Sequence, residues 1–181
     1  MRLSLVPSLV VAAVLAVPAI TSAQDVAPTA GSWGAEASAV GDVSLLRFRS
    51  STSAWLVGFS GFYNRRDEDD SATPFEATTT VAAVRLGWRG YRAPESRTRP
   101  FTTLAALVGY DDTAFGATWQ FGGQFEYGAA YFFTRHVSLG ASFDLRAVFG
   151  VGEREQPFDD EIDVMHVTLS TGLRFLGAVY F

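Results

Sequence analysis

The sequence predicts an all-β fold, an eight-stranded antiparallel up-and-down transmembrane β-barrel, and three observations support this prediction. From Met165 to Phe181, apolar residues alternate with polar or small ones, which is the pattern of a strand with one apolar face. This segment is longer than a usual strand of a soluble domain, which has about five or six residues. Its length suits a tilted strand that crosses a bilayer in about 9–11 residues. Further segments alternate in the same way, and the 14% of aromatic residues is typical of barrels with aromatic girdles.

The amino-terminal residues have the pattern of a secretory signal. Arg2 precedes an apolar run from Leu3 to Ala19, and Thr21 to Ala23 supply small residues before a cut ahead of Gln24. Two prolines and the brevity of the run favour a signal over a membrane anchor. The predicted organisation is a signal peptide at 1–23, a linker at 24–31 and the barrel at 32–181.

Composition excludes several classes of function. The chain has no cysteine, which rules out a disulfide scaffold and a thiolate metal site. Removal of Arg2 from the 14 basic residues leaves 13 against 19 acidic ones, a formal charge of −6 that argues against nucleic-acid binding. No phosphate loop, dinucleotide fingerprint or zinc spacing is present, so we expect no cofactor and no metal. No segment after the signal approaches the roughly 20 apolar residues of a transmembrane helix.

The alternating segments follow one another between turn signals. The expected strands span residues 32–40, 43–49, 55–63, 80–89, 102–110, 119–131, 137–149 and 165–181. In the second strand the alternation is lost at Leu45-Leu46, where a bulge would restore it. Long polar or acidic loops are expected from Asn64 to Ala77, Asp111 to Ala117 and Gly150 to Val164. Alternation of brief turns with longer loops is expected of an outer-membrane barrel, although the Gly41-Asp42 turn would be an unusually small outer loop.

Each strand has a second face, opposite the apolar one, and the composition of this second face decides which side of the barrel meets lipid. It carries small residues together with charged and polar ones, and the interior of an eight-stranded barrel is so narrow that small side chains must alternate with large polar ones. The other face is aromatic, with Trp and Tyr near strand ends, where a bilayer interface favours them. We therefore place the aromatic face in lipid, rather than inside a soluble barrel. The expected interior polar network comprises Arg85, Arg89, Gln124, Glu126, Asp144, Arg146 and Arg174.

Strand pairing predicts part of that network. Pairing around the turn at Thr134 to His136, with its flanking residues opposite each other, places Glu126 opposite Asp144 and Gln124 opposite Arg146. Two facing carboxylates repel, so cations must lie beside them.

Three arginines are candidates for those cations. Arg146 lies diagonal to Glu126, and Arg85 or Arg174 could reach across the lumen. The hypothesis is a hydrogen-bonded plug that closes the lumen. The alternative is a narrow watery channel lined by arginines without fixed partners, which would carry small solutes.

Two segments carry a resemblance to a known class: Tyr131 to Gly140, and the terminal Phe181 with Val179, Phe175 and Leu173 at alternate positions that Gly177 interrupts. Through them the chain resembles the small eight-stranded barrels of the Gram-negative outer membrane, similar to the transmembrane domain of outer membrane protein A and its relatives. In that class the last strand is the signal that the barrel-assembly machinery recognises. The resemblance implies a monomer in the cell outer membrane, surrounded by lipid and lipopolysaccharide, with a structural or surface-interaction role. It specifies no ligand.

An enzyme is the third alternative, because some small barrels modify lipid A. The lipid A deacylase family uses a His-x-Ser pair on the barrel wall, and the nearest match is His166-Val167-Thr168. Thr replaces Ser, and by alternation His166 points inward rather than to lipid, so we expect no catalysis. The acidic runs at Asp67 to Asp70 and Asp159 to Asp163 could hold divalent cations, but they lack EF-hand spacing and are expected to be solvated loop tips.

Overall fold

The computed structural model describes residues 28–68, 75–113, 116–155 and 161–181, and the side chains of 64–68, 75–78, 153–155 and 161–164 lie outside that description. The predicted signal peptide and most of the linker also lie outside it. The strands are β1 (Trp33–Ser38), β2 (Val43–Ser50), β3 (Ser53–Glu68), β4 (Phe75–Tyr91), β5 (Thr98–Thr113), β6 (Gly116–Thr134), β7 (Val137–Glu155) and β8 (Glu161–Tyr180). Among the described residues no helix is long and apolar enough to cross a membrane.

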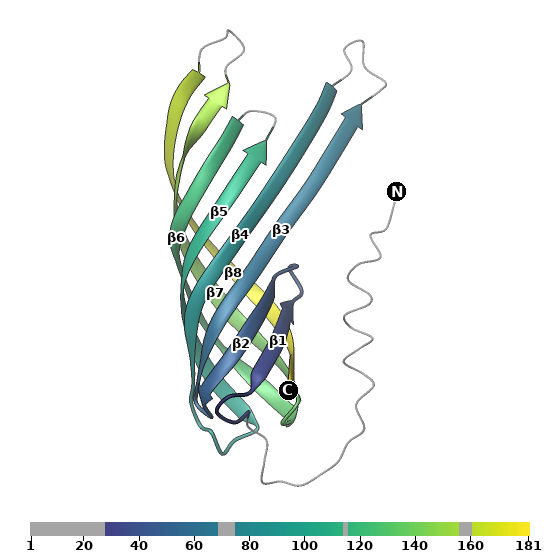
Figure 1. Cartoon of the computed structure of the whole chain (residues 1–181), viewed down its shortest axis with the longest axis vertical. Coiled ribbons are helices and arrows are strands. Elements are labelled where there is room, and N and C mark those ends of the chain that lie inside the picture. The colour runs from purple at the N-terminus through teal and green to yellow at the C-terminus, as the bar shows by residue number, and fades with distance from the viewer. Residues whose placement is uncertain (1–27, 69–74, 114–115, 156–160) are drawn as a thin grey trace.

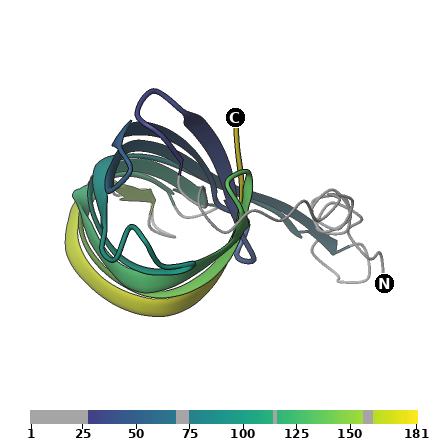
Figure 2. The ribbon, with the colours of Figure 1, turned by 90° about the horizontal axis from the view of Figure 1, so that it is seen from below.

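The eight strands form a closed antiparallel barrel, as the alternation predicted. Each strand pairs with the next along the chain, and β1 pairs with β8 to complete the ring. Seen from below, the strands surround a single lumen (Figure 2). Because successive side chains point to opposite faces, each strand presents one series outward and one inward. Large apolar residues are exposed on the outer face of all eight strands, which is consistent with a membrane barrel.

The alternation of β2 is regular, so the predicted bulge at Leu45-Leu46 is wrong. Leu46 and Phe48 point inward and are 0% and 2% exposed, while Leu45, Arg47 and Arg49, which alternate with them, are exposed. The register shifts instead between Phe48 and Ser50. The outward arginines of β2 lie over aromatic rings, with Arg47 4.9 Å from the centre of the Trp33 ring. The prediction failed because these inward positions belong to an apolar layer in the lumen, described below.

The strands are longer than the sequence predicted, and the three expected long loops are wrong. Pairing continues to Glu68↔Phe75 between β3 and β4, to Thr113↔Gly116 between β5 and β6, and to Glu155↔Glu161 between β7 and β8. Residues 69–74, 114–115 and 156–160 connect these pairs. Polar side chains do not end an antiparallel ladder, because its hydrogen bonds join backbone groups.

The first hairpin is much shorter than the others. β1 and β2 have 6 and 8 residues, against 16 in β3 and 20 in β8. The turn between them contains Gly41, whose φ of 92° lies in the left-handed region that favours glycine. In Figure 1 this hairpin ends about half way up the wall formed by the other strands.

The short hairpin leaves the upper wall interrupted. β2 pairs with β3 only as far as Val43↔Phe59, and β1 pairs with β8 only as far as Ser38↔Leu176. Beyond these positions, β3 and β8 each have a paired neighbour on one side only within the described residues. We call this interruption the lateral gap; it is bordered by β3 from Ser60 upward and by β8 from Arg174 upward.

Candidate functional site in the barrel lumen

The lower lumen, beside the short hairpin, is filled by apolar side chains that we call the apolar layer. Its rings pack closely: the Phe48 and Tyr180 rings are 5.6 Å apart and the Phe132 and Tyr180 rings 5.5 Å apart. Such edge and stacked pairs are favourable for aromatic quadrupoles. The layer comprises Leu46, Phe48, Ala54, Leu56, Tyr91, Phe101, Ala130, Phe132, Leu176, Ala178 and Tyr180.

Arg99 closes the apolar layer from below. Its side chain is buried and donates hydrogen bonds to the carbonyl oxygen of Ser96 at 3.0 Å and to that of Pro94. Its guanidinium lies 5.0 Å from the centre of the Phe132 ring. The turn between β4 and β5 is thereby held against the end of the barrel, since these contacts join the turn backbone to a lumen side chain.

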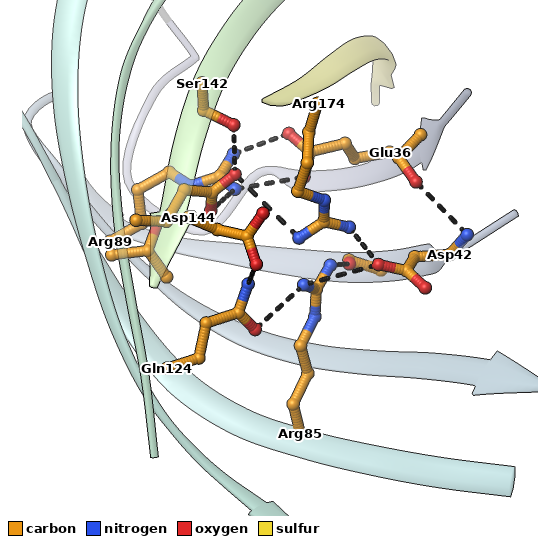
Figure 3. A network of polar contacts seen from close by, with 12 residues as sticks. Glu36, Asp42, Arg85, Arg89, Gln124, Ser142, Asp144 and Arg174 are labelled. Carbon is orange, nitrogen blue, oxygen red and sulfur yellow. Dashed lines mark hydrogen bonds and ion pairs between the residues drawn. The ribbon is translucent and has the colours of Figure 1, made fainter. Parts of the chain in front are cut away.

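Above the apolar layer lies an ionic layer, whose first part is centred on Arg89. This guanidinium makes two contacts with Glu36, at 2.5 and 3.0 Å, and a third with Glu126 at 3.1 Å. Its Nε donates to Thr103 at 2.9 Å, and its face covers the Phe101 ring at 4.4 Å. Arg89 therefore joins both layers, and Figure 3 shows it facing Glu36.

The second part of the ionic layer is centred on Asp42, at the tip of the short hairpin. Its Oδ2 accepts a hydrogen bond from Arg174 and another from Arg146 at 3.4 Å, and lies 3.8 Å from Nη1 of Arg85. Figure 3 shows the guanidinium groups of Arg85 and Arg174 converging on this carboxylate. One carboxylate thus serves three arginines from three different strands.

Polar side chains connect these two centres. Gln124 accepts from Arg85 at 3.2 Å and donates to Asp144 at 3.4 Å, and Asp144 accepts from Arg146 at 2.8 Å. Two serines extend the network: Ser44 accepts from Arg85 at 2.7 Å, and Ser142 donates to Glu126 at 2.6 Å.

The ionic layer is balanced in charge. Its four arginines (85, 89, 146 and 174) face four carboxylates (36, 42, 126 and 144), so the formal charge is zero. All these side chains are at most 8% exposed except that of Arg146, at 27%. Balance matters, because removing one partner of a buried pair leaves an uncompensated charge.

The structure brings all seven residues of the predicted interior network into this layer. The predicted register is also present, with Glu126 opposite Asp144 and Gln124 opposite Arg146, and a shift beside the turn leaves Phe133 without the expected partner. The predicted partners of Glu126 are partly wrong.

Glu126 meets Arg89 at 3.1 Å and Arg174 at 3.9 Å, whereas Arg146 and Arg85 lie closer to other acceptors. Because Arg146 extends along its own strand to Asp144, its diagonal position does not bring it to Glu126.

Sequence reasoning missed half of the acidic partners. Glu36 belongs to the polar series of β1, so alternation alone places it inward, where it meets Arg89. Asp42 carried no such signal, because an Asp next to Gly41 is typical of a turn. The apolar layer also had a signal, since Phe101, Phe132 and Tyr180 all belong to the inward series of their strands.

Above the ionic layer the lumen continues as a space that we call the cup. At its floor is a cavity of about 10 Å³, room for one water molecule, beside Asp42, Arg85 and Arg146. The His166 ring lies against Gly150, where a Cβ atom would come within 2.2 Å of it. Most other side chains on the inward faces at this level are small, apolar or neutral polar: Ser60, Ala83, Leu107, Gln120, Val148, Thr168 and Ser170. The exception is Asp111 in the inward series of β5, which has one carboxylate oxygen that is buried without a hydrogen-bond partner among the described residues.

The residues of the predicted assembly signal lie on the outer face of β8. Phe175, Val179 and Phe181 are all exposed, and Phe181 exchanges backbone hydrogen bonds with Trp33 at 2.8 and 2.9 Å. The side chains of both acidic runs, in which cation binding was considered, lie outside the described residues.

The fold and the lumen together define a class: a closed eight-stranded antiparallel barrel with exposed apolar residues outside and a buried charged network inside. Comparison with known proteins found no matching family model, no similar curated protein and no similar solved structure.

Proposed function

We propose that this protein is an integral barrel of the Gram-negative outer membrane with a structural or surface-interaction role. The observation that carries the proposal is the distribution of side chains across the wall. Trp55, Leu86 and Phe143 are among many large apolar residues exposed outside, while the charged residues of the ionic layer are buried inside. An apolar exterior of this extent is unfavourable in water and favourable in lipid.

The two lumen layers support a closed barrel rather than a channel. The apolar layer contains no charged side chain, and its aromatic members are at most 5% exposed. The ionic layer above it has fixed partners for each guanidinium, instead of arginines free to line a watery path. A conducting pore would need both layers to rearrange.

The remaining parts of the proposal concern partners and chemistry. The outward residues of the last strand are available to the barrel-assembly machinery, as the resemblance implies, and the barrel is proposed to be a monomer in contact with lipid and lipopolysaccharide. No catalytic role is proposed, because His166 and Thr168 both belong to the inward series. Mass spectrometry after incubation with lipopolysaccharide tests this, since loss of an acyl chain would contradict it.

Electrophoresis in cold detergent tests the membrane barrel. Closed membrane barrels resist unfolding by dodecyl sulfate, so the unboiled protein should migrate faster than the boiled one. A folded, freely water-soluble monomer would contradict the proposal. Planar bilayer recording tests the plug: the expected result is no stable conductance, and a steady open level would favour the narrow channel instead.

A further inference from the structure

The lateral gap lies at the height of the apolar wall rather than above it. Val167, Leu169 and Leu173, which border the gap on β8, are 77%, 69% and 74% exposed. On β7, which has a paired neighbour on both sides, outward Leu145 and Phe149 are only 36% and 39% exposed. The three residues of β8 pair with Phe149, Ala147 and Phe143 of β7, so the gap lies at the level of the apolar outer wall. Figure 1 shows that the other strands continue above the short hairpin.

Unpaired strand edges at that height need polar surroundings. Each backbone N–H or C=O left without a partner in hydrocarbon costs several kcal/mol, and open edges are tolerated only where they are covered by protein or line a wet cavity. The edges of β3 and β8 border the cup, so the gap joins the bilayer to the interior of the barrel.

Part of the inward surface of the cup is accessible. Thr168 and Ser170 of β8 are exposed although they belong to the inward series, and Val148 of β7 is half-buried. Phe62, in the inward series of β3 at the gap, is 59% exposed. The ionic layer forms the floor.

We infer that the lateral gap is a port through which a hydrocarbon chain of a bilayer lipid enters the cup above the ionic layer. The inference rests on the proposed membrane location. The lateral gap opens toward the hydrocarbon core of the bilayer, so lipid chains are the groups present there. The arginines of the floor are already paired with carboxylates, and the ester oxygens of a lipid can accept hydrogen bonds from edge N–H groups.

A second copy of the chain fits the gap less well. Copies inserted in the same direction are related by an axis along the membrane normal, and barrel strands tilt by about 35–45°. Two β8 edges would then cross instead of running alongside each other, so they could not form a ladder.

Photocrosslinking with a phospholipid that carries a diazirine in its acyl chain tests the inference. The full mature chain is reconstituted in phosphatidylethanolamine and phosphatidylglycerol vesicles doped with this lipid, irradiated and mapped by tandem mass spectrometry. The expected adducts fall on outward residues such as Val108 and also on inward Thr168 and Val148 in the cup. Inward Leu56, in the apolar layer, should carry none.

The outcomes separate this inference from the proposed function. Adducts on outward residues alone would overturn the lateral port and leave the membrane barrel standing. Absence of adducts from every position would overturn both, because the wall itself would not then be in lipid.

Two neighbouring alanines of β4 provide a matched pair of variants. Ala83 lines the cavity at the cup floor, and Ala82 is exposed on the outer face. The variant Ala83→Phe should lose most adducts in the cup and retain those outside, while Ala82→Phe should keep both. Faster migration of the unboiled sample shows that each variant is folded. Equal adducts in the cup for both folded variants would overturn the port.

Discussion

Asp42 and Arg174 form an ion pair inside the lumen although they are 132 positions apart in the sequence. Asp42 lies at the tip of the first hairpin and Arg174 on the last strand. The pair therefore fastens the short hairpin to the strand that closes the barrel. Because the same carboxylate also faces Arg85 and Arg146, it is the acceptor on which the upper ionic layer depends.

Neutralising Asp42 should destabilise the barrel. Asp42→Asn keeps the side-chain shape but leaves a formal charge of +1 in the ionic layer, and breaking a buried ion pair costs about 3–5 kcal/mol. The free energy of unfolding in urea, measured in vesicles, should fall by that order. Asp112→Asn, at an exposed position of β5, is the control and should change little. Equal effects of the two substitutions would contradict the assignment.

A second prediction concerns the coupling of Arg89 with Glu36. Arg89→Gln leaves two buried carboxylates without their shared cation and should cost about 3–5 kcal/mol. Glu36→Gln in the same protein removes one of those charges. The double variant should therefore lose less free energy of unfolding than the two single variants lose in sum, with a coupling free energy of about 0.5–3 kcal/mol. Unfolding free energies of the four proteins measure it. Simple additivity would show that the bidentate contact does not contribute.

The strands and their register were predictable because alternation of period two is a local property. Glu126 lies opposite Asp144 as expected, since a slip of one residue would turn every side chain of a strand to the wrong face. The ends of strands were not predictable in this way. Residues from Asn64 to Glu68 are polar, yet they continue the ladder because backbone groups pair regardless of side chain.

Most members of the ionic layer were predictable from alternation, but Asp42 and the pairing of the charges were not. Which guanidinium reaches which carboxylate depends on distances across the lumen, and these follow from the barrel as a whole. Asp42 was missed because a turn residue normally lies outside the barrel. Here the hairpin is so short that its tip lies beside the mid-lumen, where Asp42 meets Arg174 and Arg146.

The apolar layer provides a third prediction, through two adjacent phenylalanines. Phe132 is 0% exposed in the lumen and Phe133 is 49% exposed on the outer face. Phe132→Ala leaves a cavity between Tyr91 and Tyr180 and should cost about 3–5 kcal/mol. Phe133→Ala should cost much less, because lipid replaces the lost ring. The heating temperature at which the fast-migrating band disappears reports both effects, and a larger loss for Phe133→Ala would refute the layer.

The outer wall, which is proposed to face lipid, provides the fourth prediction, which depends on depth in the bilayer. Leu139 and Leu145 both point outward from β7, but Leu139 is close to the turn at its start whereas Leu145 is midway along the outward apolar series that ends at Val151. An arginine costs about 2–4 kcal/mol at the bilayer midplane and about 0–1 near the interface of a membrane barrel. Leu145→Arg should therefore lower the free energy of unfolding in vesicles by several times more than Leu139→Arg. If the two substitutions cost the same, or if Leu145→Arg is tolerated like an ordinary surface change, the outer wall is not in hydrocarbon.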